Sequence, residues 1–311
     1  MRSRSRMSRP ARTARTARSA RAATAEVAAL ATRVGSLLRS GTPNRRALQH
    51  AQDEELAVEI TRGTSAAAAL AARDGAAWKM FAALWHVAEH SGAPLASACD
   101  RIVATLGAVE RLEQRKTVLL AGPKLTLILV SALPLAATGF GELMGFRPTR
   151  VLLSPLGIPI IVLGAGFLIA GITWTRLMIK KLAERPPDTG LEAELLWVAL
   201  SGGTAIAPAV KLVVDTLDSF SVEWAQPQAL AAGGAVTDLL RRAGHTGEAV
   251  NAALLEAARA QREAGFTRLE ADAEKLAVRV LAPLAVCILP AFSILGVVPT
   301  VIAMFSTVAG A

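Results

Sequence analysis

The sequence predicts an all-α, polytopic membrane protein with three transmembrane helices and two cytoplasmic antiparallel helical bundles. Its 311 residues are 52% hydrophobic and 19% charged, whereas a soluble domain carries about a quarter charged residues. The deficit of charge is concentrated in long uncharged runs, which favours lipid contact over an oversized soluble core. The segments between these runs show apolar residues at helical spacing with charges between them.

Residues 1–25 form a basic tail. They carry most of the net charge of +9 and contain no acidic residue. The tail has too few apolar residues to fold, so we expect it to be disordered. It has no interleaved aromatic residues, so we expect no nucleic-acid binding. An arm against anionic lipid headgroups is the better interpretation, since each arginine near such a surface contributes about 1 kcal/mol. The arginines are Arg2, Arg4, Arg6, Arg9, Arg12, Arg15, Arg18 and Arg21.

Three uncharged runs predict the membrane spans. They cover residues 125–141, 151–175 and 280–311, and a bilayer core needs roughly 20 helical residues. The first run reaches this length only with its flanks, and a buried core helix is the alternative there. The third run is longer than one span needs, so its prolines predict a kink near Pro290 or a re-entrant hairpin. The predicted transmembrane helices are residues 119–146, 151–175 and 279–306.

The distribution of basic residues predicts the orientation of the spans. The short loop between the first two spans contains two basic residues, Arg147 and Arg150. The opposite ends of the spans are richer in Lys and Arg, and such positions face the cytoplasm. We therefore expect a multi-pass protein of the cell membrane with a cytoplasmic N-terminus and a C-terminus on the far side. The residues that set this bias are Arg111, Arg115, Lys116, Lys124, Arg176, Lys180, Lys181 and Arg185.

The two cytoplasmic bundles are predicted at residues 26–118 and 176–278. The first is rich in Ala and Leu, which favour helix. In the second, Thr189 and Glu192 have the spacing of a capping box at a helix start. Residues 216–235 lack a corner that the first bundle has, so we expect the second bundle to be shortened.

A short pattern that recurs five times predicts helix–turn–helix corners. It consists of Gly, five residues, Ala and a small apolar residue, and it starts at Gly41, Gly63, Gly92, Gly203 and Gly247. Gly can end a helix in the left-handed conformation, and a following threonine can cap the next helix. The order of corners, charged helix and apolar run is repeated in both halves, which indicates an internal duplication. The candidate partner-docking residues are Gly41, Thr42, Gly63, Thr64, Ser91 and Gly92.

We expect neither a catalytic site, a cofactor nor a metal. His86 and His90 flank Glu89 in the pattern of one zinc-protease family. A catalytic zinc needs a third protein ligand in a cleft, so we interpret the pair as a solvated helix end. No Gly-rich phosphate loop followed by Lys and Ser or Thr is present in the sequence.

The remaining ionisable and thiol groups also lack a predicted chemical role. Lys124 and Glu142 are the charges that come closest to the bilayer interior, and their place at the ends of the first uncharged run argues against an ion path. Cys99 and Cys287 lack the clustered spacing that a disulfide or metal framework needs. We expect both to be small buried residues.

Two blocks of the sequence carry a resemblance to a known family. Residues 89–95 (Glu-His-Ser-Gly-Ala-Pro-Leu), with the charged helix and the Gly122-Pro123 pair that follow, resemble the tight-adherence (Flp pilus) TadB branch of the type II secretion system F family. Residues 273–299 are similar to its TadC branch. The resemblance covers about residues 28–306.

This resemblance implies an inner-membrane platform protein without enzymatic activity. Such a scaffold couples a cytoplasmic secretion ATPase to pilin or pseudopilin subunits, and it binds itself or a sister platform protein. A membrane transporter or channel subunit is the first alternative, and a membrane-tethered hydrolase is the second.

Overall fold

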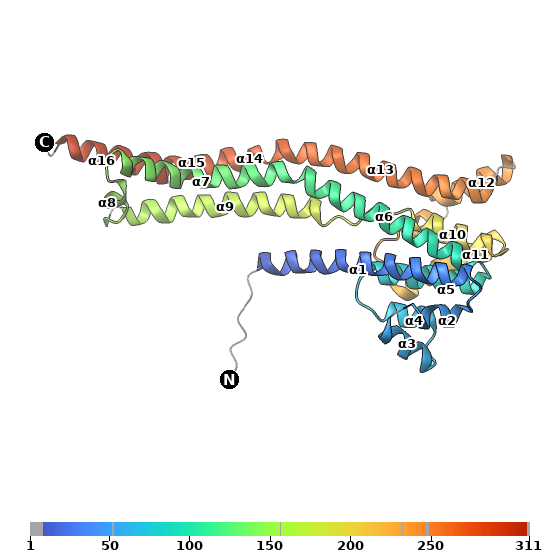
Figure 1. The fold of residues 1–311 in the computed structure, drawn as a ribbon. Helices are drawn as coiled ribbons and strands as arrows, with labels where there is room; N and C mark the ends of the chain where they lie inside the picture. The colour runs from blue at the N-terminus through green and yellow to red at the C-terminus, as the bar shows by residue number, and fades with distance from the viewer. Residues whose placement is uncertain (1–8, 52, 156, 232, 247–248, 310–311) are drawn as a thin grey trace. The chain divides into compact units, whose positions relative to one another are not determined.

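The structure is a computed structural model that describes residues 9–51, 53–155, 157–231, 233–246 and 249–309. Within these ranges the chain is helical and contains no strand (Figure 1). The elements are α1 (Arg9–Arg39), α2 (Asn44–Gln49), α3 (Glu54–Thr61), α4 (Ala66–Ala71), α5 (Ala76–Ser91), α6 (Leu95–Leu119), α7 (Ala121–Leu143), α8 (Pro148–Leu152), α9 (Gly157–Ala183), α10 (Leu191–Ser201), α11 (Ile206–Phe220), η1 (Pro227–Leu230), α12 (Ala235–Thr246), α13 (Val250–Arg279), α14 (Leu281–Pro283), η2 (Leu284–Ile288), α15 (Leu289–Phe292), η3 (Ser293–Val297) and α16 (Val298–Ala309).

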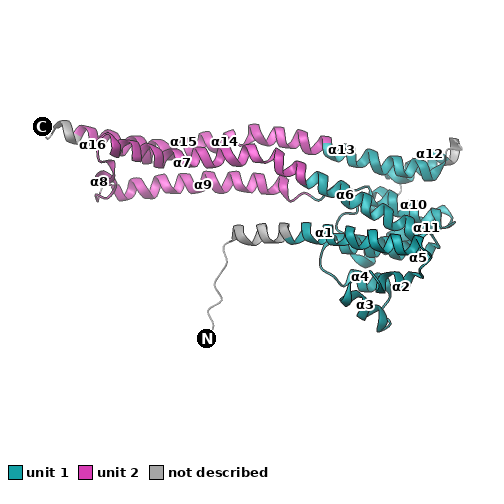
Figure 2. Ribbon diagram, in the orientation of Figure 1, with its two compact units in different colours: residues 1–113, 186–266 teal, residues 114–185, 267–311 magenta. Residues whose placement is uncertain are grey.

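The chain divides into two compact units (Figure 2). Unit 1 consists of residues 1–113 and 186–266, and unit 2 consists of residues 114–185 and 267–311. Each unit is therefore assembled from two stretches that are distant in sequence. The prediction of an all-α polytopic membrane protein is confirmed, because three of the helical stretches are long and apolar enough to cross a membrane.

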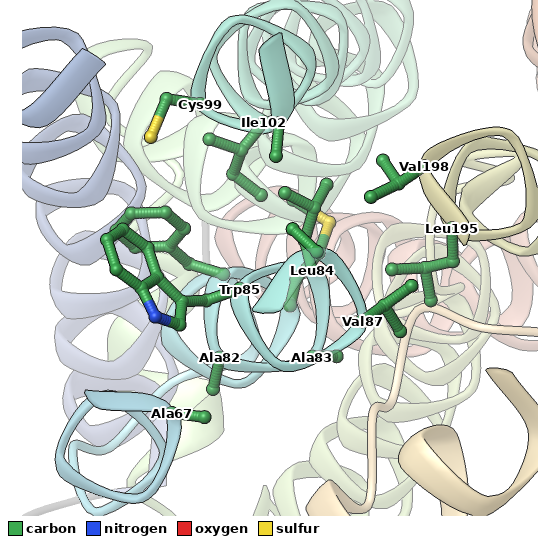
Figure 3. Close-up of a cluster of buried hydrophobic side chains, with 14 of the residues drawn as sticks. Ala67, Ala82, Ala83, Leu84, Trp85, Val87, Cys99, Ile102, Leu195 and Val198 are labelled. Atoms are coloured by element: carbon green, nitrogen blue, oxygen red, sulfur yellow. The ribbon is translucent and has the colours of Figure 1, made fainter. Parts of the chain in front are cut away.

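Helix α5 is the centre of unit 1. Trp85 and Phe81 are its largest fully buried side chains, and their rings meet edge to face with centroids 6.0 Å apart. Figure 3 shows labelled side chains on several faces of α5, with α4, α6 and α10 contributing their neighbours. A helix that is apolar on all sides must be surrounded by protein when its unit faces water. Packing rather than amphipathicity therefore fixes α5 in place.

The core of unit 1 joins two segments that are distant in the chain. One hydrophobic cluster contains Leu30 and Ile102 from the first segment together with Leu195, Val213 and Leu254 from the second. We expected two bundles, and the structure shows one shared core instead. The reason is that α5 and α10 are both buried on nearly all faces, so neither segment can cover its own central helix.

Helix α1 begins earlier than expected. The basic tail was predicted to be disordered through residue 25, whereas α1 is helical from Arg9. Residues 1–8 lie outside the described part of the chain. The physical reason for the difference is that Ala and Arg have high intrinsic helix propensity, and the repeated Ala-Arg pairs of this stretch contain many of both.

Unit 2 contains three candidate membrane spans. The first lies in a helical stretch that includes α7, the second is α9, and the third follows α13 without a helical break. The second span was predicted at residues 151–175, but α9 covers Gly157–Ala183 and the short helix α8 precedes it. Pro155 accounts for the shift, because a proline disfavours helical backbone at the residue before it. Cys287 in the third span and Cys99 in unit 1 are both buried free thiols, as predicted.

The third span changes its helical register twice. Segments η2 and η3 are π-helical, and they end two residues before Pro290 and Pro299, respectively. A proline removes one amide donor from the helical ladder, and a π-helical turn is one way for a helix to accommodate the resulting mismatch. The span therefore absorbs its prolines through these turns within a continuous helical stretch, and the re-entrant hairpin that we considered is not formed.

Glycines set the packing of the helices in unit 2. A Cβ added at Gly164 would lie 2.4 Å from the Cγ of Leu295, and one added at Gly171 would lie 2.7 Å from Cγ1 of Ile288. From the first contact to the second, the position advances by seven residues on α9 and goes back by seven residues on the third span. The two helices are therefore antiparallel, and their contacts repeat every seven residues. Small residues that allow close backbone approach are typical of helix contacts in membranes.

Candidate functional site

The glycine corners of unit 1 share one backbone geometry. Gly41, Gly63 and Gly92 have φ values of 88°, 98° and 74°, which only glycine adopts at little cost. After each of them, the next amide N–H donates to the carbonyl oxygen five residues earlier, at 3.0 to 3.2 Å. This bond is the signature of a Schellman helix end. Gly203 also has a positive φ, of 85°, and Gly247 lies outside the described residues.

The capping expectation for the threonines is wrong. Ser65 rather than Thr64 caps α4, because its Oγ accepts from the amide of Ala68 at 3.2 Å. Pro43 occupies the cap position of α2, which has no side-chain cap bond. The corners at Gly41 and Gly63 are therefore one residue longer than we expected, and Thr42 and Thr64 lie in the turns themselves.

Five of the six candidate docking residues reach solvent. Gly41, Gly63, Thr64 and Gly92 are exposed and Thr42 is half-buried, whereas Ser91 is only 9% exposed. Ser91 is therefore a packing residue. We name the solvent-facing turns at residues 41–43, 63–65 and 92–94 the corner surface.

Polar contacts link these three turns. Arg39 Nη1, just before Gly41, donates to Asp100 Oδ1 at 2.9 Å, which ties the end of α1 to the start of α6 after Gly92. Arg45 Nη2 donates to the carbonyl oxygen of Ile60 at 2.9 Å, which ties α2 to the end of α3 before Gly63. The Arg39–Asp100 pair is exposed, and exposed ion pairs add little stability. We therefore interpret both contacts mainly as links that fix the relative positions of the turns.

The Gly92 corner packs directly against the end of α10. A Cβ added at Gly202 would lie 2.1 Å from the carbonyl oxygen of Ser91, so only glycine fits there. Beside this contact is a small apolar pocket of about 230 Å³. The guanidinium of Arg101 lies 5.7 Å from the ring centre of Trp197, which is one of the pocket residues. The pocket is lined by Ala93, Pro94, Ser97, Ala98, Trp197, Val198 and Ser201.

Two buried carboxylates in α10 form a polar site inside the core. Glu194 is 1% exposed, and its Oε1 accepts from Arg262 Nη1 at 2.7 Å. Its other oxygen accepts from the hydroxyl of Thr105. The charge of Glu194 is therefore compensated by a cation, as a buried charge requires. Because Thr105 belongs to the first segment and Arg262 to the second, Glu194 joins the two segments that form unit 1.

Glu192 has a different environment from Glu194. It is fully buried, one oxygen accepts from the amide of Gln226, and the other has no hydrogen-bond partner among the described residues. Burial, together with the nearby charges of Asp188 and Glu194, raises the pKa of Glu192 to about 7. The predicted capping box is not formed, because Gly190 is the cap residue of α10 and Glu192 bonds to Gln226 instead.

The buried carboxylate pair was not recognised in the sequence. The signal was present, since Glu192 and Glu194 stand in a run of residues that is otherwise apolar (residues 191–200). A helix that is apolar all round is a buried helix, so charges within it require partners inside the core. Nothing in the sequence, however, identifies Arg262 and Gln226 as those partners.

The His86–His90 pair lacks the geometry of a metal centre. The ring centres are 3.8 Å apart, but His90 Nδ1 donates to the carbonyl oxygen of His86 at 2.8 Å. The pKa of His86 is lowered by burial and by the neighbouring His90. Among the described residues, no three His, Cys, Asp or Glu side chains are arranged to hold a metal ion.

Glu142 at the end of α7 has a structural contact. Its Oε1 accepts from the amide of Thr149 at 2.9 Å and also from the hydroxyl of Thr149. It thus fixes the loop between the first two spans. This role is distinct from an ion path through the middle of a membrane, where ionisable side chains would line the span interior.

Comparison with protein families gives a match over the first part of the chain. Residues 30–141 match the model of the family described as type II secretion system (T2SS), protein F. The matched segment runs from α1 to α7, so it contains the whole corner surface and most of the first candidate span. Comparisons with curated proteins and with solved structures give no match.

Proposed function

We propose that this chain, whose residues 30–141 form a domain of the type II secretion system F family, is a platform subunit of a secretion or pilus-assembly machine in the cell membrane. Unit 2 serves as the membrane body and unit 1 as a water-facing docking body. The observation that carries the proposal is the shared core of unit 1. It turns two segments, separated by two spans, into one rigid surface on which a soluble partner can act.

The shared core also supports the proposed topology. A packed hydrophobic core cannot be divided by a bilayer, so both segments of unit 1 face the same side. The two spans between them, α7 and α9, return the chain to that side. The positive-inside bias favours the cytoplasm. We therefore infer that unit 1 and the N-terminus are cytoplasmic, where a secretion ATPase is found.

The corner surface and the pocket beside Trp197 are the proposed docking site for that ATPase. Most residues of these turns reach solvent and contacts link the turns to each other, and loops positioned by a scaffold are common binding sites. Pilin or pseudopilin subunits would meet the membrane body instead. A second copy of this chain or a sister platform protein completes the assembly. The Flp pilus branch of the family is the proposed setting, because of the two sequence blocks described above.

The docking proposal is tested by co-purification of the full chain, in detergent, with the secretion ATPase of the same cell. The test variant is Thr64→Arg combined with Ser97→Arg, which alters the corner surface and the pocket. Its control, Ala25→Arg combined with Ala72→Arg, adds the same charge at exposed positions outside the corner surface. We expect the native chain and the control to recover the ATPase and the test variant to lose at least tenfold. Failure of the native chain to recover the ATPase contradicts the platform function, and equal recovery by both variants contradicts the docking site.

A transporter is the rival function, and the structure offers a direct way to separate the two. Glu142 lies at the end of α7, and Lys180 and Lys181 lie in the last turn of α9, so these charges are not in the middle of the candidate spans. Reconstitution in vesicles that shows ion or solute flux would favour the transporter.

A further inference from the structure

Residues 221–230 are held on the core of unit 1 by a small set of contacts. This stretch connects α11 to α12, and it includes η1. Val222 and Leu230 are buried. The carbonyl oxygen of Trp224 accepts from the hydroxyl of Thr189 at 2.9 Å, and the amide of Gln226 donates to Glu192. Gln226 Nε2 also donates to Asp188 Oδ1 at 2.7 Å, and Trp224, Ala225 and Ala229 are partly buried against the core. We name residues 221–230 the latch segment.

Glu192 and Glu194 differ in what happens when each is ionised. Glu194 has a charged partner in Arg262, at 2.7 Å, and a hydroxyl donor in Thr105. Glu192 has a single backbone donor, and its second oxygen is buried with no partner among the described residues. A buried charge without a counter-ion carries a large desolvation cost. Ionisation therefore destabilises the buried position of Glu192 but not that of Glu194.

We propose that Glu192 is a protonation-controlled latch, which holds residues 221–230 against α10 when it is neutral and releases them when it is ionised. Release lets the ionised carboxylate reach water, because the peptide that covers it moves away. The proposal concerns a conformational switch within unit 1 and does not depend on the platform function.

The charged groups around Glu192 all act in the direction of release. Asp188 precedes α10 and Glu194 follows on it, and both are acidic. The cation Arg262 of α13 is bonded to Glu194 and to the carbonyl oxygen of Thr189. On α5, Lys79 pairs with Glu223 at the surface, at 3.8 Å. Glu192 therefore has no cation of its own in this set of neighbours.

The pKa of Glu192 gives the pH range of the switch. Its folded pKa of about 7 lies above the ordinary value of 4.5. Because the folded pKa of this acid is raised, the closed state loses stability as the pH rises from 4.5 to about 7. At higher pH the loss of stability is complete. Between pH 6 and pH 8, the equilibrium constant for opening should rise about tenfold.

Hydrogen–deuterium exchange of the full chain in detergent tests this inference. Exchange is measured at pH 6, 7 and 8 and is corrected for the intrinsic pH dependence of the chemistry. We expect protection of residues 221–230 to fall about tenfold between pH 6 and pH 8, while protection of α5 is unchanged. In Glu192→Gln, a neutral side chain of the same shape can still accept from Gln226, so the protection should be independent of pH.

A matched control separates the latch from a general surface effect. Glu223→Gln removes an exposed acid from the latch segment itself, and its pH profile should match that of the native chain. Native protection that is flat from pH 6 to pH 8, or a Glu192→Gln profile that falls as the native one does, overturns the proposal. If Glu192→Gln does not fold, the native profile decides: a fall confined to residues 221–230 supports the latch, and a fall spread over α5 contradicts it.

Discussion

Units 1 and 2 are both built from packed helices, but they place large and small side chains in opposite ways. In unit 1 the large apolar residues are inside, and Phe81 is 0% exposed at the centre of α5. In unit 2 they are outside, with Leu135 on α7 73% exposed and Val162 on α9 68% exposed. The contacts inside unit 2 are made at glycines such as Gly164 and Gly171.

The difference between the units identifies the solvent of each. Water drives large apolar side chains into a core, whereas lipid is as apolar as leucine and provides no such drive. Helices in lipid then associate by close backbone approach at small residues. The arrangement of side chains therefore supports a water-facing unit 1 and a lipid-facing unit 2 independently of hydropathy.

The largest expected effect comes from truncation of a side chain in the core of unit 1. Phe81→Ala should lower the free energy of unfolding by about 3–5 kcal/mol, because it leaves a cavity in a close-packed core. Leu135→Ala, at an exposed position of α7, should change it by less than about 1 kcal/mol. Denaturant unfolding of the full chain in detergent, followed by tryptophan fluorescence, measures both. Similar losses in the two variants would break the comparison between the units.

An intermediate effect is expected from enlargement of a glycine in unit 2. Gly164→Leu inserts a side chain where even a Cβ would lie 2.4 Å from Leu295, and overpacking of this kind costs about 1–3 kcal/mol. Gly166→Leu is the matched control on the same helix, because a Cβ there meets nothing within 4 Å. Thermal unfolding in detergent should show a lower midpoint for Gly164→Leu only. A lower midpoint for both would mean that glycine matters here for reasons other than close packing.

The smallest of the three effects concerns a helix cap in unit 1. Ser65→Ala should cost about 1 kcal/mol, because the hydroxyl accepts from the amide of Ala68. Thr64→Ala, one residue earlier, should be close to neutral. The same unfolding measurement applies to both variants. A larger loss from Thr64→Ala than from Ser65→Ala would restore the capping role that the sequence assigned to Thr64.

The features that depend on local sequence were predictable. The uncharged runs identified all three candidate spans, and the glycine pattern identified corners at Gly41, Gly63 and Gly92, where the positive φ allows little else. The capping errors and the shifted second span are also local. Ser65 competes with Thr64 as an equally good cap, and Pro155 delays the start of α9.

The features that depend on distant contacts were not predictable. The packing of α5 on α10 joins residues more than a hundred positions apart, and periodicity within one helix carries no information about its partner. The same holds for the candidate site. Exposure of the Gly41 and Gly63 turns followed from their chemistry, but burial of Ser91 follows from the approach of Gly202. The roles of Glu192 and Glu194 likewise depend on Gln226 and Arg262, which lie 34 and 68 residues away.

The shared core of unit 1 imposes an order on biosynthesis. When a ribosome has completed α5, the helices α10 and α11 that will cover it do not yet exist, and both spans α7 and α9 must first enter the membrane. Leu217 of α11, a buried member of the same core cluster, follows Ser91 at the end of α5 by 126 residues. At about 5–20 residues per second, the growing chain exposes the apolar surface of α5 for roughly 6–25 s. Successful insertion of the spans is therefore required before α5 can be buried. A nascent chain whose spans fail to insert exposes the apolar helix α5 to chaperones and proteases.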